Sequence, residues 1–596
     1  MKKANRSFTM MQRAVRLHQQ GQIPEAEISY QKVLAVDPRH ADALRLLGSL
    51  YIQWNKIESA IGCFEKALSI APDHPELLNN LGVALYSQGK FDDALTHYQQ
   101  AIKIAPDYCD AINNLGNLFY QCGKLDDAII WLERSVRLKP DNPQAHACLG
   151  HAFRMQKKNG QAIAHYRHAL ERAPDDIEIL TNLGNMLRDA GQSEDACALY
   201  RRLAELRPHD GKIRLNLGTI FHDLGKWDEA MEQYESALKL QSDSTDAIVN
   251  RASLLMELNR PEEARAGYAQ GLNLNPHLRD AKWGQSLAAL MLGEYLEGWA
   301  LYETRFEYPA MRHLIPSQAP RWDGRVLDGK RLLIWSEQGF GDALQFIRYA
   351  ALCKDRGGTI IVLCREPLVR LLKNCPCIDE VITTSGEDNF DCQISVMSLP
   401  YVFGTTLDTI PHDIPYLYVS EEARHKWTPR FADTKDLKIG LVWAGNPRKS
   451  RIDAHVTDRQ RSMSLALMEP LLRFGRCRFY NLQKGEASGE IEASGAQTNL
   501  IDYMPEVEDF MDTAAIIKNL DLVISVDTSV VHLAGGLGKP VWVLSRFGGC
   551  WRWLRNQESN PWYPTTRIFG QPAPGDWKGC VDKICLALHE KLLDRG

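Results

Sequence analysis

Small residues recur along the first half of the chain at a constant spacing. A glycine column repeats every 34 residues at Gly48, Gly82, Gly116, Gly150, Gly184 and Gly218. An alanine column keeps the same step through eight segments: Ala26, Ala60, Ala94, Ala128, Ala162, Ala196, Ala230 and Ala264. Small side chains at fixed positions allow two helix backbones to approach each other. The pattern therefore predicts helix pairs that follow one another in tandem.

Aromatic and proline columns complete the repeat. The aromatic column consists of Tyr30, Phe64, Tyr98, Tyr166, Tyr200, Tyr234 and Tyr268, with Leu132 in one segment. We expect these rings to pack between neighbours, and prolines such as Pro38 and Pro72 to end the second helix of each segment. Period and residue types resemble the tetratricopeptide repeat. Since one unit cannot bury its apolar face alone, eight units and a partial ninth predict an α-solenoid over residues 1–306.

One further column of the repeats is polar. Its members occupy one position of the first helix: Asn80, Asn114, Asn182, Asn216 and Asn250. Asparagine is a mediocre helix former, so its recurrence needs a cause. The side-chain amide has both donors and an acceptor, and can bind a peptide backbone without reading its sequence. Either this column binds an extended acceptor peptide, or each asparagine satisfies a neighbouring helix.

The hydrophobic pattern changes after a linker at residues 307–330. Short apolar runs now alternate with helical stretches, which is typical of parallel α/β sheets. The first set of predicted strands covers residues 331–336, 359–364, 381–384 and 392–397, and the second set covers 438–443, 478–482, 522–526 and 541–544. We therefore expect two Rossmann-like lobes, at residues 331–430 and 431–596.

Three of the predicted strand ends carry residues suited to a ligand. The first is a glycine-rich turn that leads to Gly341 and Asp342 at the start of a helix. The second contains Gly445 and is followed by Arg448, Lys449, Arg451, Arg459 and Arg461. The third is a polar turn before a helix, with Asp527, Thr528, Ser529 and His532. Amides at a helix N-terminus suit a phosphate, and ligands bind outside the carboxyl ends of parallel strands. We expect all three turns to face one cleft.

These motifs resemble those of a known class of enzyme. Residues 330–582 resemble a GT-B glycosyltransferase domain of the heptosyltransferase type. The whole chain resembles bacterial fusions of tetratricopeptide repeats to a glycosyltransferase, a plan shared with the O-linked N-acetylglucosamine transferases. The resemblance implies that Asp342 is the general base and that Lys484 binds a phosphate. It also implies that Asp527, Thr528 and His532 hold the diphosphate of the donor. From their places at the strand ends, we expect Gly341, Gly445, Arg461 and Ser529 to complete the donor site. The segment at residues 547–553 has no counterpart in that pattern.

Simpler interpretations of the same residues stay open at this point. Asp342 is also a suitable helix N-cap. The charges at Arg448, Lys449 and Arg451 also fit a solvated loop, and Trp443 suits core packing as well as stacking on a ligand.

Composition narrows the class of protein. The chain has 596 residues, 44% of them hydrophobic, and a net charge of −5, which argues against a nucleic-acid protein. Its 14 cysteines have no paired spacing and fit free thiols of a reducing compartment. No apolar stretch has the length of a signal peptide or a membrane span. We expect a cytoplasmic protein.

Taken together, these features predict a metal-independent protein O-glycosyltransferase. It would need no cofactor and would move a sugar from a nucleotide-sugar to a protein held by the repeats; flagellin or another surface protein is an acceptor that the resemblance suggests. The alternative is a repeat scaffold or adaptor whose glycosyltransferase-like half is catalytically inactive.

Overall fold

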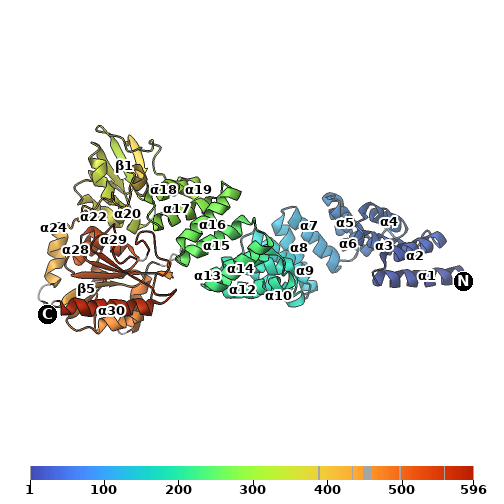
Figure 1. Cartoon of the computed structure of the whole chain (residues 1–596). Helices are drawn as coiled ribbons and strands as arrows, with labels where there is room; N and C mark the ends of the chain where they lie inside the picture. Colours follow the sequence, from blue (N-terminus) through green and yellow to red (C-terminus); the bar gives the residue numbers. More distant parts are fainter. Residues whose placement is uncertain are drawn as a thin grey trace. The chain divides into compact units, whose positions relative to one another are not determined.

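The computed structural model of the chain (Figure 1) describes residues 2–337, 339–386, 389–431, 434–446, 458, 460–494, 499–555 and 557–594. It divides into two compact units, residues 1–209 and 210–596. The first unit is helical. The second unit contains further helix pairs and two parallel sheets.

Unit 1 consists of six antiparallel helix pairs. Its helices are α1 (Lys2–Gln19), α2 (Ile23–Val36), α3 (Ala41–Gln53), α4 (Ile57–Ile70), α5 (Pro75–Ser87), α6 (Phe91–Ile104), α7 (Cys109–Gln121), α8 (Leu125–Leu138), α9 (Pro143–Met155), α10 (Asn159–Arg172), α11 (Ile177–Asp189) and α12 (Ser193–Leu206). Each second helix ends just before the proline column; α2, for example, ends at Val36 and Pro38 follows. The expected position of these helix ends is confirmed.

Unit 2 begins with three more helix pairs. They are α13 (Gly211–Asp223) with α14 (Trp227–Leu240), α15 (Thr245–Glu257) with α16 (Pro261–Leu274), and α17 (Arg279–Met291) with the shorter α18 (Tyr295–Tyr302). The last pair is the partial ninth repeat. It joins the core of the α/β region, because Trp299 packs edge-on against Trp551 and Tyr295 accepts a hydrogen bond from Trp562 Nε1 at 3.0 Å.

The glycine and aromatic columns meet inside one repeat. A Cβ atom on Gly48 would lie 2.5 Å from the ring of Phe64, and one on Gly82 would lie 2.6 Å from that of Tyr98. In both cases the two residues belong to the paired helices of a single repeat. Phe64, Tyr98, Tyr166, Tyr200 and Tyr234 each fill the space that the missing side chain of a glycine in their own repeat leaves. Tyr268 lies against Gly284 of the next helix pair, as the expected packing between neighbours predicts.

The linker is not free of regular structure. A 3-10 helix at Glu303–Glu307 leads into it, and it contains the short α19 (Pro309–Arg312). The backbone N–H of Trp322 then donates to the carbonyl of Gln393 at 2.9 Å, so the end of the linker lies beside the first sheet. The absence of a helical period did not predict this short helix, since one turn is too short to show a period.

Two parallel sheets follow. The first has the order β3-β2-β1-β4, built from β1 (Arg331–Trp335), β2 (Thr359–Leu363), β3 (Glu380–Ile382) and β4 (Cys392–Ser395). The second has the order β10-β9-β8-β5-β6-β7, built from β5 (Leu437–Val442), β6 (Cys477–Asn481), β7 (Leu500–Ile501), β8 (Leu522–Val526), β9 (Val541–Ser545) and β10 (Thr566–Gly570). All eight predicted strands are present; β7 and β10 were missed.

Helices connect and cover these strands. They are α20 (Phe340–Phe346), α21 (Ala350–Lys354), α22 (Val369–Lys373), α23 (Leu399–Val402), α24 (Glu421–Trp427), α26 (Glu469–Leu472), α27 (Glu490–Ser494), α28 (Phe510–Lys518), α29 (Ser529–Gly536) and α30 (Trp577–Leu593). The proposed lobe boundary near residue 430 stays a prediction.

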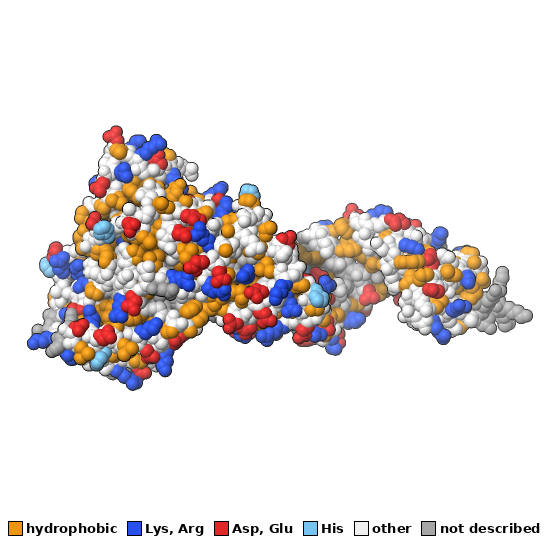
Figure 2. All heavy atoms as spheres, viewed as in Figure 1, with side chains coloured by type: hydrophobic (Ala, Val, Ile, Leu, Met, Phe, Trp, Pro, Cys, Tyr) orange, Lys and Arg blue, Asp and Glu red, His pale blue; other side chains and the backbone are white. Residues whose placement is uncertain are grey.

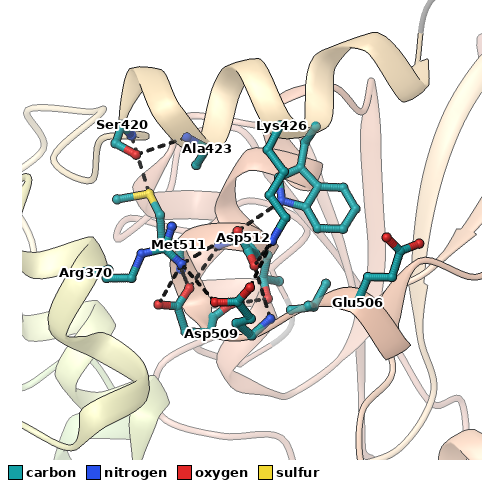
Figure 3. Close-up of polar contacts among 12 residues, drawn as sticks. Arg370, Ser420, Ala423, Lys426, Glu506, Asp509, Met511 and Asp512 are labelled. Atoms are coloured by element: carbon teal, nitrogen blue, oxygen red, sulfur yellow. Dashed lines mark hydrogen bonds and ion pairs between the residues drawn. The ribbon is translucent and has the colours of Figure 1, made fainter.

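A charged network ties α22 and α24 to the start of α28 (Figure 3). The carboxylate of Asp512, fully buried, accepts hydrogen bonds from Lys426 at 3.0 Å and from the indole of Trp427 at 3.1 Å. Asp509 caps α28 and lies 3.3 Å from the guanidinium of Arg370. In the chain, α22 lies between β2 and β3 of the first sheet and α28 precedes β8 of the second, so this network joins helices that belong to the two sheets.

Charge on the viewed surface is mixed. In Figure 2, basic and acidic side chains are interspersed and do not gather by sign. In the described part of the chain, no helix combines the length and the apolar character needed to cross a bilayer.

Candidate functional site

The candidate site is a cavity at the carboxyl ends of the strands. In the second sheet, β5 and β8 are neighbours, but the chain continues from them in opposite directions, to β6 and to β9. Such a reversal of strand order opens a crevice where ligands bind in open α/β sheets. The cavity has a volume of about 630 Å³, and most of the residues that line it follow β1, β2, β5, β6, β7 or β8.

The structure brings the predicted site residues of the α/β region together. The cavity is lined by Gly341, Asp342, Gly445, Arg461, Lys484, Asp527, Thr528, Ser529 and His532, among others. Arg448, Lys449, Arg451 and Arg459 lie outside the described residues. Trp443 is fully buried, so its side chain packs in the core and does not face a ligand.

The N-terminus of α29 faces the cavity. Thr528 is its N-cap, but no side chain caps the helix; the Thr528 hydroxyl lies 3.1 Å from that of Ser525 instead. Ser529 and Val530, in the first turn, also line the cavity. Uncapped amides and the positive end of the helix dipole suit an anion.

His532 lies behind this helix start and is almost completely buried, with 4% of its surface exposed. Its ring stacks on Trp553, with centroids 5.5 Å apart, and its Nδ1 lies 3.0 Å from the hydroxyl of Tyr563. Burial, reinforced by the positive charges of Arg552 and other arginines, holds the pKa of His532 well below its ordinary value of 6.5. The imidazole is therefore neutral at pH 7, and it contributes hydrogen bonding and packing, not charge.

Gly341 brings the first sheet against this histidine. A Cβ atom at Gly341 would lie 2.9 Å from Cδ2 of His532, closer than two carbon atoms can pack. Glycine is needed here because the start of α20 and the start of α29 approach each other directly.

Asp342 pairs with an arginine that the sequence analysis did not assign. The N-cap of α20 is Gly339, so the interpretation of Asp342 as an N-cap is wrong; it lies in the first turn. Its Oδ1 accepts a hydrogen bond from Nη2 of Arg552 at 2.6 Å. Burial lowers the pKa of Arg552, but the charge of Asp342 and its neighbours outweighs this and raises it above the ordinary value.

Two further cations contact protein groups at the cavity wall. Arg461 is ion-paired with Asp458, and its side chain fills the space next to Gly445, where a Cβ atom would lie 2.9 Å from the guanidinium. Within the described residues, Nε of Arg461 is buried without a hydrogen-bond partner. Lys484 donates to the backbone carbonyl of Val507 at 2.7 Å. A ligand phosphate would have to compete with that carbonyl.

Several cavity residues were missed. Arg365 lies over the ring of Phe340, which contacts Phe510 with centroids 5.0 Å apart; all three line the cavity. No motif marks these positions. Arg552 had a signal, since it stands between two tryptophans in the segment without a counterpart, but only the fold reveals its partner.

The asparagine column is partly engaged with neighbouring helices. Asn114 donates to the side chain of Asn79 at 2.9 Å, and Asn250 donates to the hydroxyl of Thr219 at 3.3 Å. These bonds agree with the structural interpretation for two members. All five column residues are only partly buried, so their role in peptide binding stays a prediction.

No group of three His, Cys, Asp or Glu side chains in the described ranges could hold a metal ion.

Family comparisons identify the repeats. Residues 4–253 match the model of the cilia and flagella-associated protein 70 C-terminal domain, which bears the tetratricopeptide designation, and residues 221–290 match a tetratricopeptide repeat model. The first half of the chain therefore consists of tetratricopeptide repeats. Neither match reaches the two sheets.

A curated relative is Protein FlbA of Caulobacter vibrioides, 28% identical over 335 residues. The aligned part covers 50% of this chain and 53% of that protein, so the chain spans about half the length of this relative.

Solved repeat proteins are similar over shorter parts. Pseudomonas aeruginosa PilF is 20% identical, with a TM-score of 0.34, over 37% of this chain and 100% of that chain. YrrB, described as a TPR protein with an unusual peptide-binding site, is 20% identical, with a TM-score of 0.29, over 31% of this chain and 95% of that chain.

Proposed function

We propose that this repeat protein is a glycosyltransferase that moves a sugar from a nucleotide-sugar donor to a protein acceptor. The observation that carries the proposal is that one cavity gathers the uncapped start of α29, the side chains of Arg461 and Lys484, and the carboxylate of Asp342. The two parallel sheets support the proposal, because strands from both sheets end at the cavity, as the resemblance to a GT-B enzyme implies.

The reaction assigns a role to each group. The acceptor hydroxyl oxygen attacks the anomeric carbon of the sugar, and Asp342 takes the proton of that hydroxyl. The bond between the anomeric carbon and the diphosphate oxygen breaks, and the nucleoside diphosphate leaves with the electron pair. Arg461, Lys484 and the amides of α29 stabilise the negative charge that develops on the leaving group.

The repeats supply the acceptor. Tetratricopeptide repeats are binding surfaces for protein segments, and the partly buried amides of the asparagine column are suited to an extended backbone. Each hydrogen bond stabilises such a complex by only about 0.5–1.5 kcal/mol net, so the surface would bind a segment through the sum of several contacts.

The first test is ligand binding. Thermal unfolding of the full chain is followed with UDP, GDP, ADP and CMP and with their sugar conjugates. A ligand that binds only the native state raises the unfolding temperature by mass action. We expect one nucleotide class to give a selective rise that is reduced in Thr528→Val. If no nucleotide has an effect, the protein is better described as a scaffold.

The second test is the base. Once the donor is known, Asp342→Asn should reduce transfer to a protein acceptor by at least about a hundredfold, while the variant still binds the nucleotide. If transfer survives in Asp342→Asn, Asp342 is not the base.

A further inference from the structure

Arg552 is held in a fixed position at the cavity. Its Nε donates to Oε1 of the fully buried Gln345 at 2.9 Å, and its guanidinium lies 4.2 Å from the ring centroid of Trp551. Asn560 binds its backbone carbonyl at 2.6 Å. Only 16% of the Arg552 side chain is exposed. The guanidinium is therefore placed by the protein before any ligand arrives.

Such a group needs a negative partner at all times. A largely buried cation without a counter-charge costs several kcal/mol, and in this structure Asp342 provides the counter-charge. The described partners of Arg552, which are Gln345, Asp342 and the sulfur of Cys550, account for three of the five guanidinium N–H groups. Beyond these described partners, two donors remain for a second anion, and Arg552 lines the cavity.

A phosphate would be a stronger partner than Asp342. It carries more negative charge than one carboxylate, and its oxygens match the fork of a guanidinium. The same cavity offers the start of α29 and Arg461 to the rest of a diphosphate.

We propose that Arg552 is shared between Asp342 and a phosphate group of the ligand, so that phosphate binding releases Asp342 from its ion pair. Asp342 serves as counter-charge in the empty cavity and becomes available to an acceptor hydroxyl only after the phosphate has bound. Donor binding then precedes acceptor activation. The role of the released carboxylate rests on the proposed function, whereas the sharing of Arg552 is independent of sugar transfer.

A double-mutant cycle with inorganic pyrophosphate tests this sharing. Calorimetric titration of the full-length protein is carried out with the wild type, Asp342→Asn, Arg552→Gln and the double variant. We expect Arg552→Gln to weaken binding by about tenfold or more, because it removes charge-assisted hydrogen bonds. Asp342→Asn should tighten binding by about threefold to tenfold, because the competing carboxylate is gone. The double variant should bind as weakly as Arg552→Gln alone.

The double variant distinguishes the sharing of Arg552 from a simple repulsion between the Asp342 carboxylate and the anion. If Asp342→Asn tightens binding by the same factor with and without Arg552, its carboxylate only repels the anion, and the proposal is wrong. The proposal is also wrong if neither the wild type nor Asp342→Asn binds pyrophosphate. Additive effects of the two substitutions, or no pyrophosphate binding, would contradict the sharing of Arg552 even if the protein transfers a sugar from a nucleotide-sugar. Conversely, if the two substitutions are coupled but no donor gives sugar transfer, the proposed function is wrong and the sharing of Arg552 still holds.

Two further variants control for the fold. Arg473→Gln removes an exposed arginine away from the cavity, whose partner is Glu469 at 2.6 Å, and should leave the pyrophosphate affinity within about twofold. Arg552→Lys keeps the positive charge but loses the bidentate hydrogen bonding of the guanidinium, and it should bind pyrophosphate more tightly than Arg552→Gln does. If Arg552→Gln unfolds, Arg552→Lys takes its place, and an unchanged pyrophosphate affinity in Arg552→Lys overturns the proposal, because the bidentate contact of the guanidinium is lost there.

Discussion

Gly341 shows how one residue positions two halves of a site. It carries no side chain to separate α20 from α29, and the ring of His532 occupies the space where a Cβ atom would lie. The ring cannot easily move, because it is stacked on Trp553 and bonded to Tyr563.

Replacement of Gly341 by alanine should therefore damage the site. We expect Gly341→Ala to cost about 1–3 kcal/mol of stability, as overpacking does, and to weaken nucleotide or pyrophosphate binding. Chemical denaturation and titration calorimetry measure the two effects. Gly570→Ala is the control, because no heavy atom lies within 4 Å of its added Cβ. Equal stability and affinity in both variants would contradict the close approach.

Among the elements, the helix pair α9 and α10 contains a cluster of three histidines. Nε2 of His146 bonds to the carbonyl of Pro140 at 3.0 Å, and its Nδ1 lies 3.0 Å from Nδ1 of His165. The ring of His168 is 5.2 Å from that of His146. Burial, with the neighbouring His146 and His168, lowers the pKa of His165 from 6.5 to about 4.

This repeat should weaken in acid. The unfolded chain binds a proton at His165 below pH 6.5, whereas the folded chain resists it until about pH 4, so stability is lost as the pH falls between these values. Hydrogen exchange of α9 and α10, corrected for intrinsic rates, should increase from pH 7 to pH 5 in the wild type and less in His165→Phe. His277→Gln, at an exposed histidine, is the control. An unchanged pH response in His165→Phe would contradict the assignment.

The segment at residues 546–555 is an element without regular structure that the eighth repeat holds in place. A Cβ atom on Gly548 would lie 2.6 Å from the carbonyl oxygen of Glu257, at the end of α15. Arg555 pairs with Glu262 in the first turn of α16. Because Arg552 lies in this segment, the repeat positions the partner of Asp342.

Gly548→Ala should move this segment. The neighbour is backbone and cannot give way, so we expect a loss of about 1–3 kcal/mol in stability and a several-fold weaker affinity for pyrophosphate through Arg552. Gly475→Ala, where the added Cβ meets no heavy atom within 4 Å, is the control. Wild-type affinity in Gly548→Ala would mean that Arg552 does not depend on the repeat.

At the scale of the whole molecule, we expect the repeats to select the protein acceptor. The triple variant Asn114→Ala, Asn182→Ala and Asn216→Ala should reduce transfer to a protein acceptor by at least about tenfold, since three contacts of about 0.5–1.5 kcal/mol each are lost. Hydrolysis of the donor should change little. Rates of both reactions in one preparation give the comparison. A parallel fall in both would indicate a loss of fold, and no fall in either would favour the structural interpretation of these asparagines.

Much of the architecture was readable because it depends on local periodicity. The columns of Ala26 and Gly48 specify helix pairs wherever they recur, since close helix approach requires small residues at fixed positions. The strands from Leu522 and Val541 were found because buried parallel strands are continuous apolar runs. The two-residue β7 has no such signal, nor has β10, in which only Ile568 and Phe569 are apolar.

What the sequence determined by itself was the solenoid, the alternation of strands and helices, and the three turns with Asp342, Gly445 and Asp527, because each is a pattern within about 34 residues. Only the tertiary structure decided that the turns line one cavity, that Arg552 pairs with Asp342 across 210 positions, and that His532 is neutral. The physical reason is that ion pairing and desolvation depend on distances in space, which a sequence leaves open until strand order and helix packing bring distant segments together.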